Sequence, residues 1–242
     1  MISLVSWNIL SENCMEFKYS FLQKYYPSVN KESLKWIERK YKILNLLKSE
    51  NVDIICLQET DIRSYRFLKY HFQKIGYQIS KLYIQNPNDL KNKQYGNVVL
   101  SKLPILNEQY IAGKEQLIEF ENFQVINLHL NDQYDRIRNK EIKNILDGAD
   151  LKKNTIICGD FNNHRSSKQA EMLKKYQFKT TGKNNSTYMC DLNSIDFIYF
   201  TKQNFKIYKY EILFSEPKCK TQNLLDEIGS DHRPIFVKFT CQ

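Results

Sequence analysis

Side chains that bind metals or phosphates adjoin apolar runs of the chain at six places. A strand that carries such a residue at its end delivers it to one rim of a sheet, and several strands doing so place a polar site on a hydrophobic floor. Carboxylates, amides and imidazoles gathered in this way can bind a divalent cation, activate a water and neutralise a phosphate. The residues concerned are Asn8, Glu59, His129, Asp160, Asn162, Asp196, Asp231 and His232.

Each of these residues has a structural alternative when it is taken alone. A single Asn or Asp after a strand is usually a turn residue or a helix N-cap. A single His is usually a hydrogen-bonded surface or core residue. The recurrence argues against this reading, because the chain has four His and two of them, His129 and His232, belong to the set. We therefore interpret the eight residues as one catalytic site.

In their order along the chain, these motifs resemble the endonuclease/exonuclease/phosphatase superfamily of metal-dependent phosphodiesterases. The resemblance extends from Ser6 to Phe239, and its N-terminal part is most similar to the messenger-RNA deadenylases of the carbon catabolite repressor, nocturnin and angel group. It implies an α/β four-layer sandwich of two packed, mostly antiparallel β-sheets with helices on both outer faces. The motifs are Trp7-Asn8, Gln58-Glu59, Gly159-Asp160-Phe161-Asn162 and Ser230-Asp231-His232, with Tyr26-Pro27, Trp36 and Arg39 for the deadenylase group.

The carboxylates and amides predict a site for Mg²⁺, for which Mn²⁺ can substitute. A hard divalent cation prefers carboxylate oxygen, so Glu59 is the first candidate ligand. Asn8 is expected beside it as a neutral carbonyl ligand. Asp231 is the second candidate carboxylate.

The remaining polar residues fit the steps of phosphodiester hydrolysis. Asp160 is expected to accept the proton of the attacking water, and Asn162 to donate to the phosphoryl oxygen. Asp196 can orient His232 so that the imidazole donates to the phosphate, and His129 completes these contacts. Whether Asp160 or His232 takes the proton stays open.

Charge and aromatic content favour a polyanionic substrate, namely nucleic acid. The chain has 36 Lys and Arg against 27 Asp and Glu, a net charge of +9, with 16 Tyr and 14 Phe. Phosphates are attracted by basic side chains, and bases stack on aromatic rings; a general abundance of Lys, Asn and Ile is the alternative explanation. We expect residues 10–35 to form a loop at the rim of the site that binds single-stranded RNA, and the loop Asn86 to Tyr95 is a second candidate. The substrate-binding candidates are Lys18, Lys24, Tyr25, Tyr26, Arg39 and Asn97.

The substrate class remains divided between three alternatives. A 3′–5′ exoribonuclease of deadenylase type is favoured, followed by a DNA-repair phosphodiesterase acting on abasic sites or 5′-tyrosyl ends. A phosphatase for small phosphoesters is third, because Ile157 stands where inositol phosphatases carry a Trp. The segment Asn163-His164-Arg165-Ser166 departs from the deadenylase pattern of a small residue and a Pro, and this departure concerns the substrate.

Length and composition predict one catalytic domain over residues 1–242, monomeric and cytoplasmic or nuclear, without a signal peptide or transmembrane segment. The six cysteines form no CxxC pair, and Cys56 and Cys158 lie within apolar runs, so they are expected to be reduced and buried. Hydrophobic periodicity predicts helices over 33–49, 61–74, 133–148 and 166–176. It predicts strands over 2–9, 53–58, 77–85, 95–101, 104–111, 115–120, 123–129, 154–159, 195–201, 205–214 and 233–240.

Overall fold

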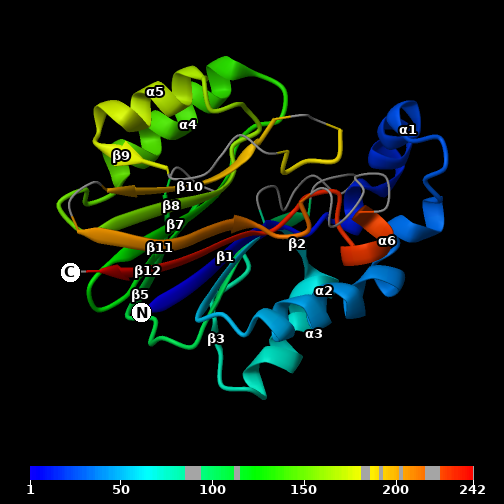
Figure 1. The fold of residues 1–242 in the computed structure, drawn as a ribbon, viewed down its shortest axis with the longest axis horizontal. Coiled ribbons are helices and arrows are strands. Elements are labelled where there is room, and N and C mark those ends of the chain that lie inside the picture. The colour runs from blue at the N-terminus through cyan, green and yellow to red at the C-terminus, as the bar shows by residue number, and fades with distance from the viewer. Residues whose placement is uncertain are drawn as a thin grey trace.

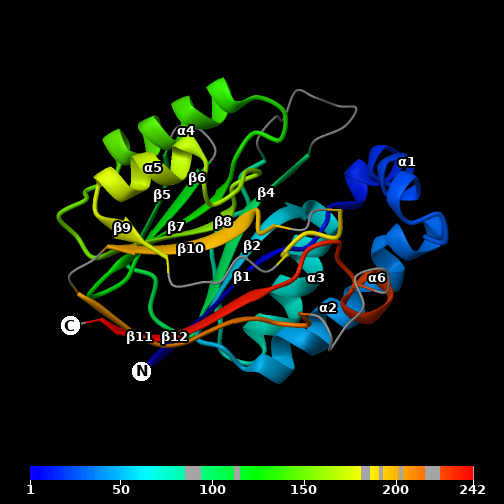
Figure 2. The same ribbon diagram turned by 45° about the horizontal axis from the view of Figure 1, so that its top comes forward.

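Two β-sheets packed face to face form the centre of the molecule, and helices cover the outer face of each (Figure 1). The computed structural model describes residues 1–84, 94–111, 115–180, 186–190, 193–201, 204–215 and 224–241. Helices α2 and α3 cover the first sheet, whereas α4 and α5 cover the second (Figure 2). This arrangement confirms the predicted four-layer α/β sandwich. Among the described residues, no helix combines the length and the apolar character that crossing a membrane requires.

Each sheet has six strands within the described residues. The first has the order β11-β12-β1-β2-β4-β3, and β1 and β2 are its parallel pair. The second has the order β5-β6-β7-β8-β10-β9, and β7 and β8 are its parallel pair. The bounds are β1 Ile2–Asn8, β2 Ile54–Asp61, β3 Gln78–Ile79, β4 Tyr95–Ser101, β5 Asn107–Ile111, β6 Glu115–Glu119, β7 Gln124–His129, β8 Thr155–Asp160, β9 Phe178–Lys179, β10 Asp196–Thr201, β11 Phe205–Ile212 and β12 Ile235–Cys241.

The helices lie between these strands in the chain. The 3₁₀ helices are η1 Glu12–Cys14 and η2 Lys31–Leu34. The α-helices are α1 Met15–Tyr25, α2 Trp36–Glu50, α3 Ile62–Gln73, α4 Asp135–Gly148, α5 Lys168–Lys175 and α6 Leu224–Ile228.

The inner faces of the two sheets bury a common hydrophobic core. The central strands β1, β2, β7 and β8 are buried along nearly their whole length because both of their faces are covered. Cys56 and Cys158 are free thiols buried within this core, as predicted. Cys241 is also a free thiol. Cys219 and the side chain of Cys14 lie outside the described part of the chain.

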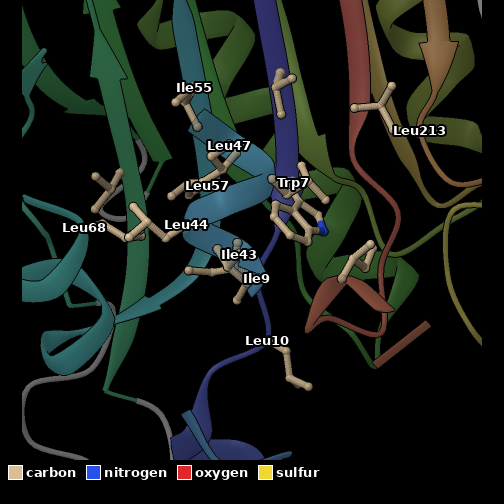
Figure 3. Close-up of a cluster of buried hydrophobic side chains, with 14 of the residues drawn as sticks. Trp7, Ile9, Leu10, Ile43, Leu44, Leu47, Ile55, Leu57, Leu68 and Leu213 are labelled. Carbon is tan, nitrogen blue, oxygen red and sulfur yellow. The ribbon is translucent and has the colours of Figure 1, made fainter. Parts of the chain in front are cut away.

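A second core joins the first sheet to helix α2 (Figure 3). Ile43, Leu44 and Leu47 point from α2 toward Trp7 and Leu57 on β1 and β2. Their spacing of three and four residues places them on one face of the helix. Burying a side chain of this size contributes about 1.5–3 kcal/mol, so this packing fixes α2 against the two strands that carry Asn8 and Glu59.

The structure corrects the expectation that residues 10–35 form a loop. This segment contains η1, α1 and η2, and Leu22, Val29 and Leu34 pack into the core below α2. The Tyr and Lys residues of this segment obscure its helical pattern in the sequence, because their apolar parts cover the edge of the core while their polar ends face solvent.

The expected strand over 77–85 shortens to Gln78–Ile79. Beyond it, the Ser80 hydroxyl accepts the Val99 N–H at 2.8 Å, so a side chain takes the place of a ladder carbonyl. Residues 86–93, which make up most of the second candidate rim, lie outside the described residues. Strand β9 and helix α6 were not predicted, since each is short.

Candidate active site

The polar residues gather at one edge of the sandwich because of the strand directions. Strand β1 ends there with Asn8, and Glu59 lies two residues before the end of the parallel strand β2. The parallel strands β7 and β8 end there with His129 and Asp160. Strand β10 is antiparallel to β8 and begins at this edge with Asp196. The segment before β12, which is antiparallel to β1, brings Asp231 and His232 to the same place.

Asp160 lies at the centre of this group. In the register of the second sheet it is paired with His129 on one side and with Asp196 on the other. The preceding Gly159 has a φ of +138°, and a Cβ at this position would lie 1.9 Å from the carbonyl oxygen of Leu128. Only glycine therefore allows the two parallel strands to approach closely enough to present Asp160.

Glu59 is held by an irregularity in strand β2. The pairing of β2 with β4 shifts register between Leu57 and Thr60, and Glu59 has a φ of +53°. A bulge of this kind redirects a side chain, and left-handed backbone at a non-glycine residue costs of the order of 1–3 kcal/mol. The Ser11 N–H donates to Glu59 Oε2 at 3.0 Å. Burial alone would raise the pKa of Glu59, but Lys18 and His129 and two hydrogen bonds lower it to about 2.

Asn8 bridges the carboxylates of the two sheets. Its Nδ2 donates to Glu59 Oε1 at 3.0 Å and to Asp160 Oδ2 at 3.1 Å. Its Oδ1 accepts the Leu10 N–H at 3.0 Å. Asn8 thus directs N–H groups toward the carboxylates, whereas we expected it to present a carbonyl ligand. This geometry fixes how the two carboxylates face each other.

Two imidazoles adjoin Asp160. His129 Nε2 lies 3.7 Å and His232 Nε2 lies 3.8 Å from Asp160 Oδ2. Behind His232, its Nδ1 lies 2.9 Å from Asp196 Oδ2. Burial would lower the pKa of His232, but Asp196 and Asp160 raise it to about 9. Burial and the charge of Asp196 raise the pKa of Asp160 above its usual range.

Asp231 forms an ion pair inside the site. Lys18 Nζ donates to its Oδ2 at 3.0 Å and lies 5.2 Å from the centre of the Tyr188 ring. The Lys18 side chain is 14% exposed and that of Asp231 is 0% exposed. Burial would lower the pKa of Lys18, but Asp231 and other neighbours raise it, so the lysine stays charged.

The donor set fits a hard divalent cation. Glu59, Asp160, Asp196 and Asp231 are all buried carboxylates in one site. The Oδ1 atom of Asp231 is buried without a hydrogen-bond partner. Such a concentration of buried carboxylate oxygen is what Mg²⁺ or Ca²⁺ requires. Asp160, Asp196 and His232 also place potential ligand atoms within 4.8 Å of one another, but the short Asp196–His232 contact favours a hydrogen-bonded pair.

Three of the predicted substrate-binding residues are buried or are hydrogen-bonded to backbone carbonyls. Arg39 is buried, and its guanidinium donates to the carbonyls of Leu34, Ile9, Gly229 and Leu10. Asn97 is buried between the sheets, where it donates to Glu115 and to a backbone carbonyl. Tyr26 donates its hydroxyl to the Met189 carbonyl at 2.6 Å. Arg39 and Asn97 therefore make their hydrogen bonds within the protein, where they support the segments that carry the site.

The other predicted positions remain accessible or close to the centre. Lys24 and Tyr25 are exposed at the end of α1. Asn162 is half-buried, with its backbone N–H donating to Asp160 Oδ1 at 2.8 Å and its Nδ2 to the Leu130 carbonyl at 2.9 Å. It thus stabilises the turn after β8.

Sequence reasoning missed several supporting residues. The Thr187 hydroxyl accepts the Asp196 N–H at 3.2 Å, and the Tyr188 ring packs at a tilt against His232 with ring centres 4.7 Å apart. Glu115 accepts the His129 N–H at 3.0 Å, and the Ser230 hydroxyl donates to the Asn8 carbonyl at 2.6 Å. The Ser230-Asp231-His232 motif could have indicated Ser230. Nothing in the sequence around Thr187 or Glu115 distinguishes them from ordinary polar residues.

Comparison with known proteins agrees with this geometry. Residues 5–232 match the model of the Endonuclease/Exonuclease/phosphatase family. Human nocturnin is 24% identical over 292 residues, which cover 99% of this chain and 65% of nocturnin. The solved human nocturnin catalytic domain with bound sulfate has a TM-score of 0.71 at 18% identity and covers 100% of this chain and 93% of that chain. ANGEL2, described as a 2′,3′-cyclic phosphatase, has a TM-score of 0.78 at 14% identity over 98% of this chain and 94% of that chain. A Bacteroides vulgatus family member has a TM-score of 0.76 at 16% identity and covers 100% of this chain and 99% of that chain.

The family match spans nearly the whole chain and contains every strand end of the site. The chain therefore belongs to the endonuclease/exonuclease/phosphatase family of hydrolases.

Proposed function

We propose that this protein is a Mg²⁺-dependent phosphodiesterase that shortens RNA from its 3′ end, as deadenylases do. The observation that carries hydrolysis is the position of Asp160 between two imidazoles, with Glu59 held opposite it by Asn8. Acid, base and cation-binding groups thus surround one small space. Phosphodiester hydrolysis needs these three functions.

Glu59 would hold the divalent ion, and Asp231 is a second carboxylate within the same site. When bound, the ion neutralises charge on the phosphate and stabilises the departing oxygen. Asn8 orients Glu59 through the hydrogen bond to Oε1. Burial raises the pKa of Glu59, but its cationic neighbours and hydrogen bonds lower it by more, so this ligand is ionised at neutral pH.

Asp160 would accept the proton of the attacking water, and His232 would donate to the phosphate. His232 is committed to Asp196 through Nδ1, which favours the protonated imidazole. A protonated ring cannot act as the base, and this supports Asp160 in that role. His129, beside the same carboxylate oxygen, would donate to a second phosphoryl oxygen.

Similarity to nocturnin and exposed basic and aromatic residues on α1 support RNA as the substrate. Lys24 and Tyr25 lie on the surface of the helix that brings Lys18 into the site. A base can stack on an exposed Tyr, and single strands present unpaired bases. The fold of ANGEL2 makes a 2′,3′-cyclic phosphate end a further substrate to test.

A substrate panel with Mg²⁺ tests this function. It contains labelled oligoadenylate, RNA with a 2′,3′-cyclic phosphate, matched duplex DNA, abasic duplex and a 5′-tyrosyl oligonucleotide. We expect a ladder of products shortened from the 3′ end of oligoadenylate. Preferred cleavage of the abasic or tyrosyl DNA would replace the RNA assignment with DNA repair, and opening of the cyclic phosphate alone would make the protein an end-processing phosphatase.

Two variants test the assigned roles. Asp160→Asn and His232→Ala should each lower kcat by about 10² or more, because each removes a group that acts mainly in the transition state. The double variant should lose less than the product of the two factors. Asp147→Asn, at an exposed position of α4, is the matched control and should retain full activity. Strictly multiplicative losses with a raised KM would indicate two independent binding contacts instead.

A further inference from the structure

The outward face of helix α3 carries a row of basic and aromatic side chains. Arg63, Arg66, Tyr70 and Lys74, spaced three, four and four residues apart, are all exposed. This spacing places them on one face of a helix. Ser64, Leu68 and Phe72 occupy the opposite face and are buried. We name these four exposed residues the α3 stripe.

The segment that carries the stripe has no acidic residue of its own, and within the stripe Arg63 is paired with Glu12 from η1 at 2.6 Å. From residue 62 to residue 84 the sequence contains no Asp or Glu, and its basic residues are Arg63, Arg66, Lys69, Lys74 and Lys81. Helix α5, by contrast, combines Lys168, Lys174 and Lys175 with Glu171. A segment with basic residues and no acidic ones attracts a polyanion.

Aromatic rings adjoin the basic residues. The ring of Phe67 on α3 meets that of Tyr41 on α2 edge to face, with ring centres 5.4 Å apart. The ring centres of Tyr70 and His71, both on α3, are 5.2 Å apart. Tyr41 is 54% exposed and Tyr70 is 58% exposed. Lys74 Nζ lies 3.8 Å from the centre of the Tyr70 ring. Helices α2 and α3 lie side by side on the outer face of the first sheet (Figure 2), so these rings form one surface.

The stripe is rigidly connected to the active site. Asp61, two residues after Glu59, caps α3 by accepting the N–H groups of Arg63 and Ser64, both at 2.9 Å. Its other carboxylate oxygen accepts the Ser11 hydroxyl at 3.3 Å. The stripe therefore begins at the rim of the site and continues from Arg63 to Lys74 for about 16 Å, at 1.5 Å per residue.

We propose that the α3 stripe binds the single-stranded RNA that continues from the active site, as an exosite for the substrate. The Arg and Lys side chains contact successive phosphates, and the exposed Tyr rings stack on bases. Interleaved cations and aromatic rings are what a single strand requires, because it offers both a charged backbone and free base faces. This inference rests on the proposed RNA substrate.

Binding measurements in EDTA test the exosite without turnover. The probe is a fluorescent oligoadenylate of about 20 nucleotides, longer than the roughly 4–16 nucleotides that one single-strand-binding fold covers. Arg66→Gln combined with Lys74→Gln removes two phosphate contacts. The slope of log K against log salt should become shallower by about 1.4, since each contact to a single strand contributes about 0.7. Lys168→Gln combined with Lys175→Gln on α5 is the control with the same charge change and should leave the slope unchanged.

Tyr70→Ala separates stacking from charge. It should weaken binding of the long oligonucleotide about 5-fold or more, as expected for about 1 kcal/mol of lost stacking, and should not change the salt slope. Equal slopes for the α3 and α5 variants, or equal losses for duplex and single strand, would overturn the exosite. Retention of oligonucleotide binding with loss of an acidic protein ligand would assign the stripe to a protein partner.

The two proposals can fail separately. If the protein hydrolyses a nitrophenyl phosphodiester but no RNA, the proposed function is wrong, and the EDTA binding data still decide the exosite. If RNA is hydrolysed and the α3 variants bind it like the wild type, only the exosite is wrong. Circular dichroism and thermal midpoints of each variant establish that it is folded.

Discussion

Replacing Lys18 by Met tests how the site tolerates its own negative charge. Lys18 is the buried cation paired with Asp231 at 3.0 Å, and both side chains are largely inaccessible. Met retains much of the apolar stem and removes the ammonium. Removing one partner of a buried ion pair costs about 3–5 kcal/mol, because the other charge stays buried without compensation. Since Lys18 keeps some solvent contact, we expect the lower end, about 3 kcal/mol.

The measurement is urea or thermal unfolding of the metal-free protein in EDTA. A loss of about 3 kcal/mol corresponds to a decrease in melting temperature of about 6–12 °C for a chain of this size. Added Mg²⁺ should recover at least about 1 kcal/mol more in the variant than in the wild type, because a bound cation supplies the charge that Lys18 provided. Lys24→Met, at an exposed position of the same helix, is the control and should stay within about 0.5 kcal/mol of the wild type.

Two results would refute this reasoning. A loss below about 1 kcal/mol in EDTA would mean that the Lys18–Asp231 pair does not compensate a buried charge. A loss of stability of the expected size that Mg²⁺ does not reduce would mean that the bound ion does not interact with Asp231.

Three further changes test the supporting geometry. Glu59→Gln should abolish Mg²⁺-dependent turnover, as EDTA should in the wild type. In the folded protein the pKa of Glu59 is lowered from 4.5 to about 2, which stabilises the metal-free wild type by about 3 kcal/mol at pH values above 4.5. This stabilisation is lost as the pH falls toward 2. The free energy of unfolding, measured against pH, should show this loss in the wild type and lack it in the variant. Gly159→Ala should destabilise the fold by several kcal/mol and lower kcat, since its Cβ would meet the Leu128 carbonyl; a fully active, equally stable variant would contradict the strand geometry. Arg39→Lys should lower the melting temperature and leave KM for RNA unchanged, because one ammonium cannot replace a guanidinium bonded to four carbonyls; an unchanged melting temperature with a raised KM would restore Arg39 as a substrate contact.

Two of the predicted substrate-binding residues carry a signal of burial in the sequence. Arg39 follows Trp36 by three residues and precedes Ile43 by four, so it lies on the apolar face of α2. Asn97 is two residues from Val99 and shares its face of β4, which points between the sheets. In both cases the residue type suggested substrate binding, whereas the periodicity indicated burial.

The sequence by itself determined most of the strands, the helices α2 to α5 and the chemical types at the strand ends. Continuous apolar runs specify buried strands locally, and a polar residue directly after such a run must lie at the sheet edge. The parallel pairs β1–β2 and β7–β8 then bring Asn8, Glu59, His129 and Asp160 together. This part of the site follows from short-range pattern and strand direction.

Only the tertiary structure decided which charges meet within the site. Lys18 and Asp231 are 213 residues apart in the chain, and Asn8 and Asp160 are 152 apart. Such pairs depend on how α1 packs over the sheet edge and on how closely the two sheets approach, which no local pattern encodes. The same holds for the pKa values, because burial and neighbouring charges set them. The sequence therefore predicts the composition of the site, and long-range packing determines its electrostatics.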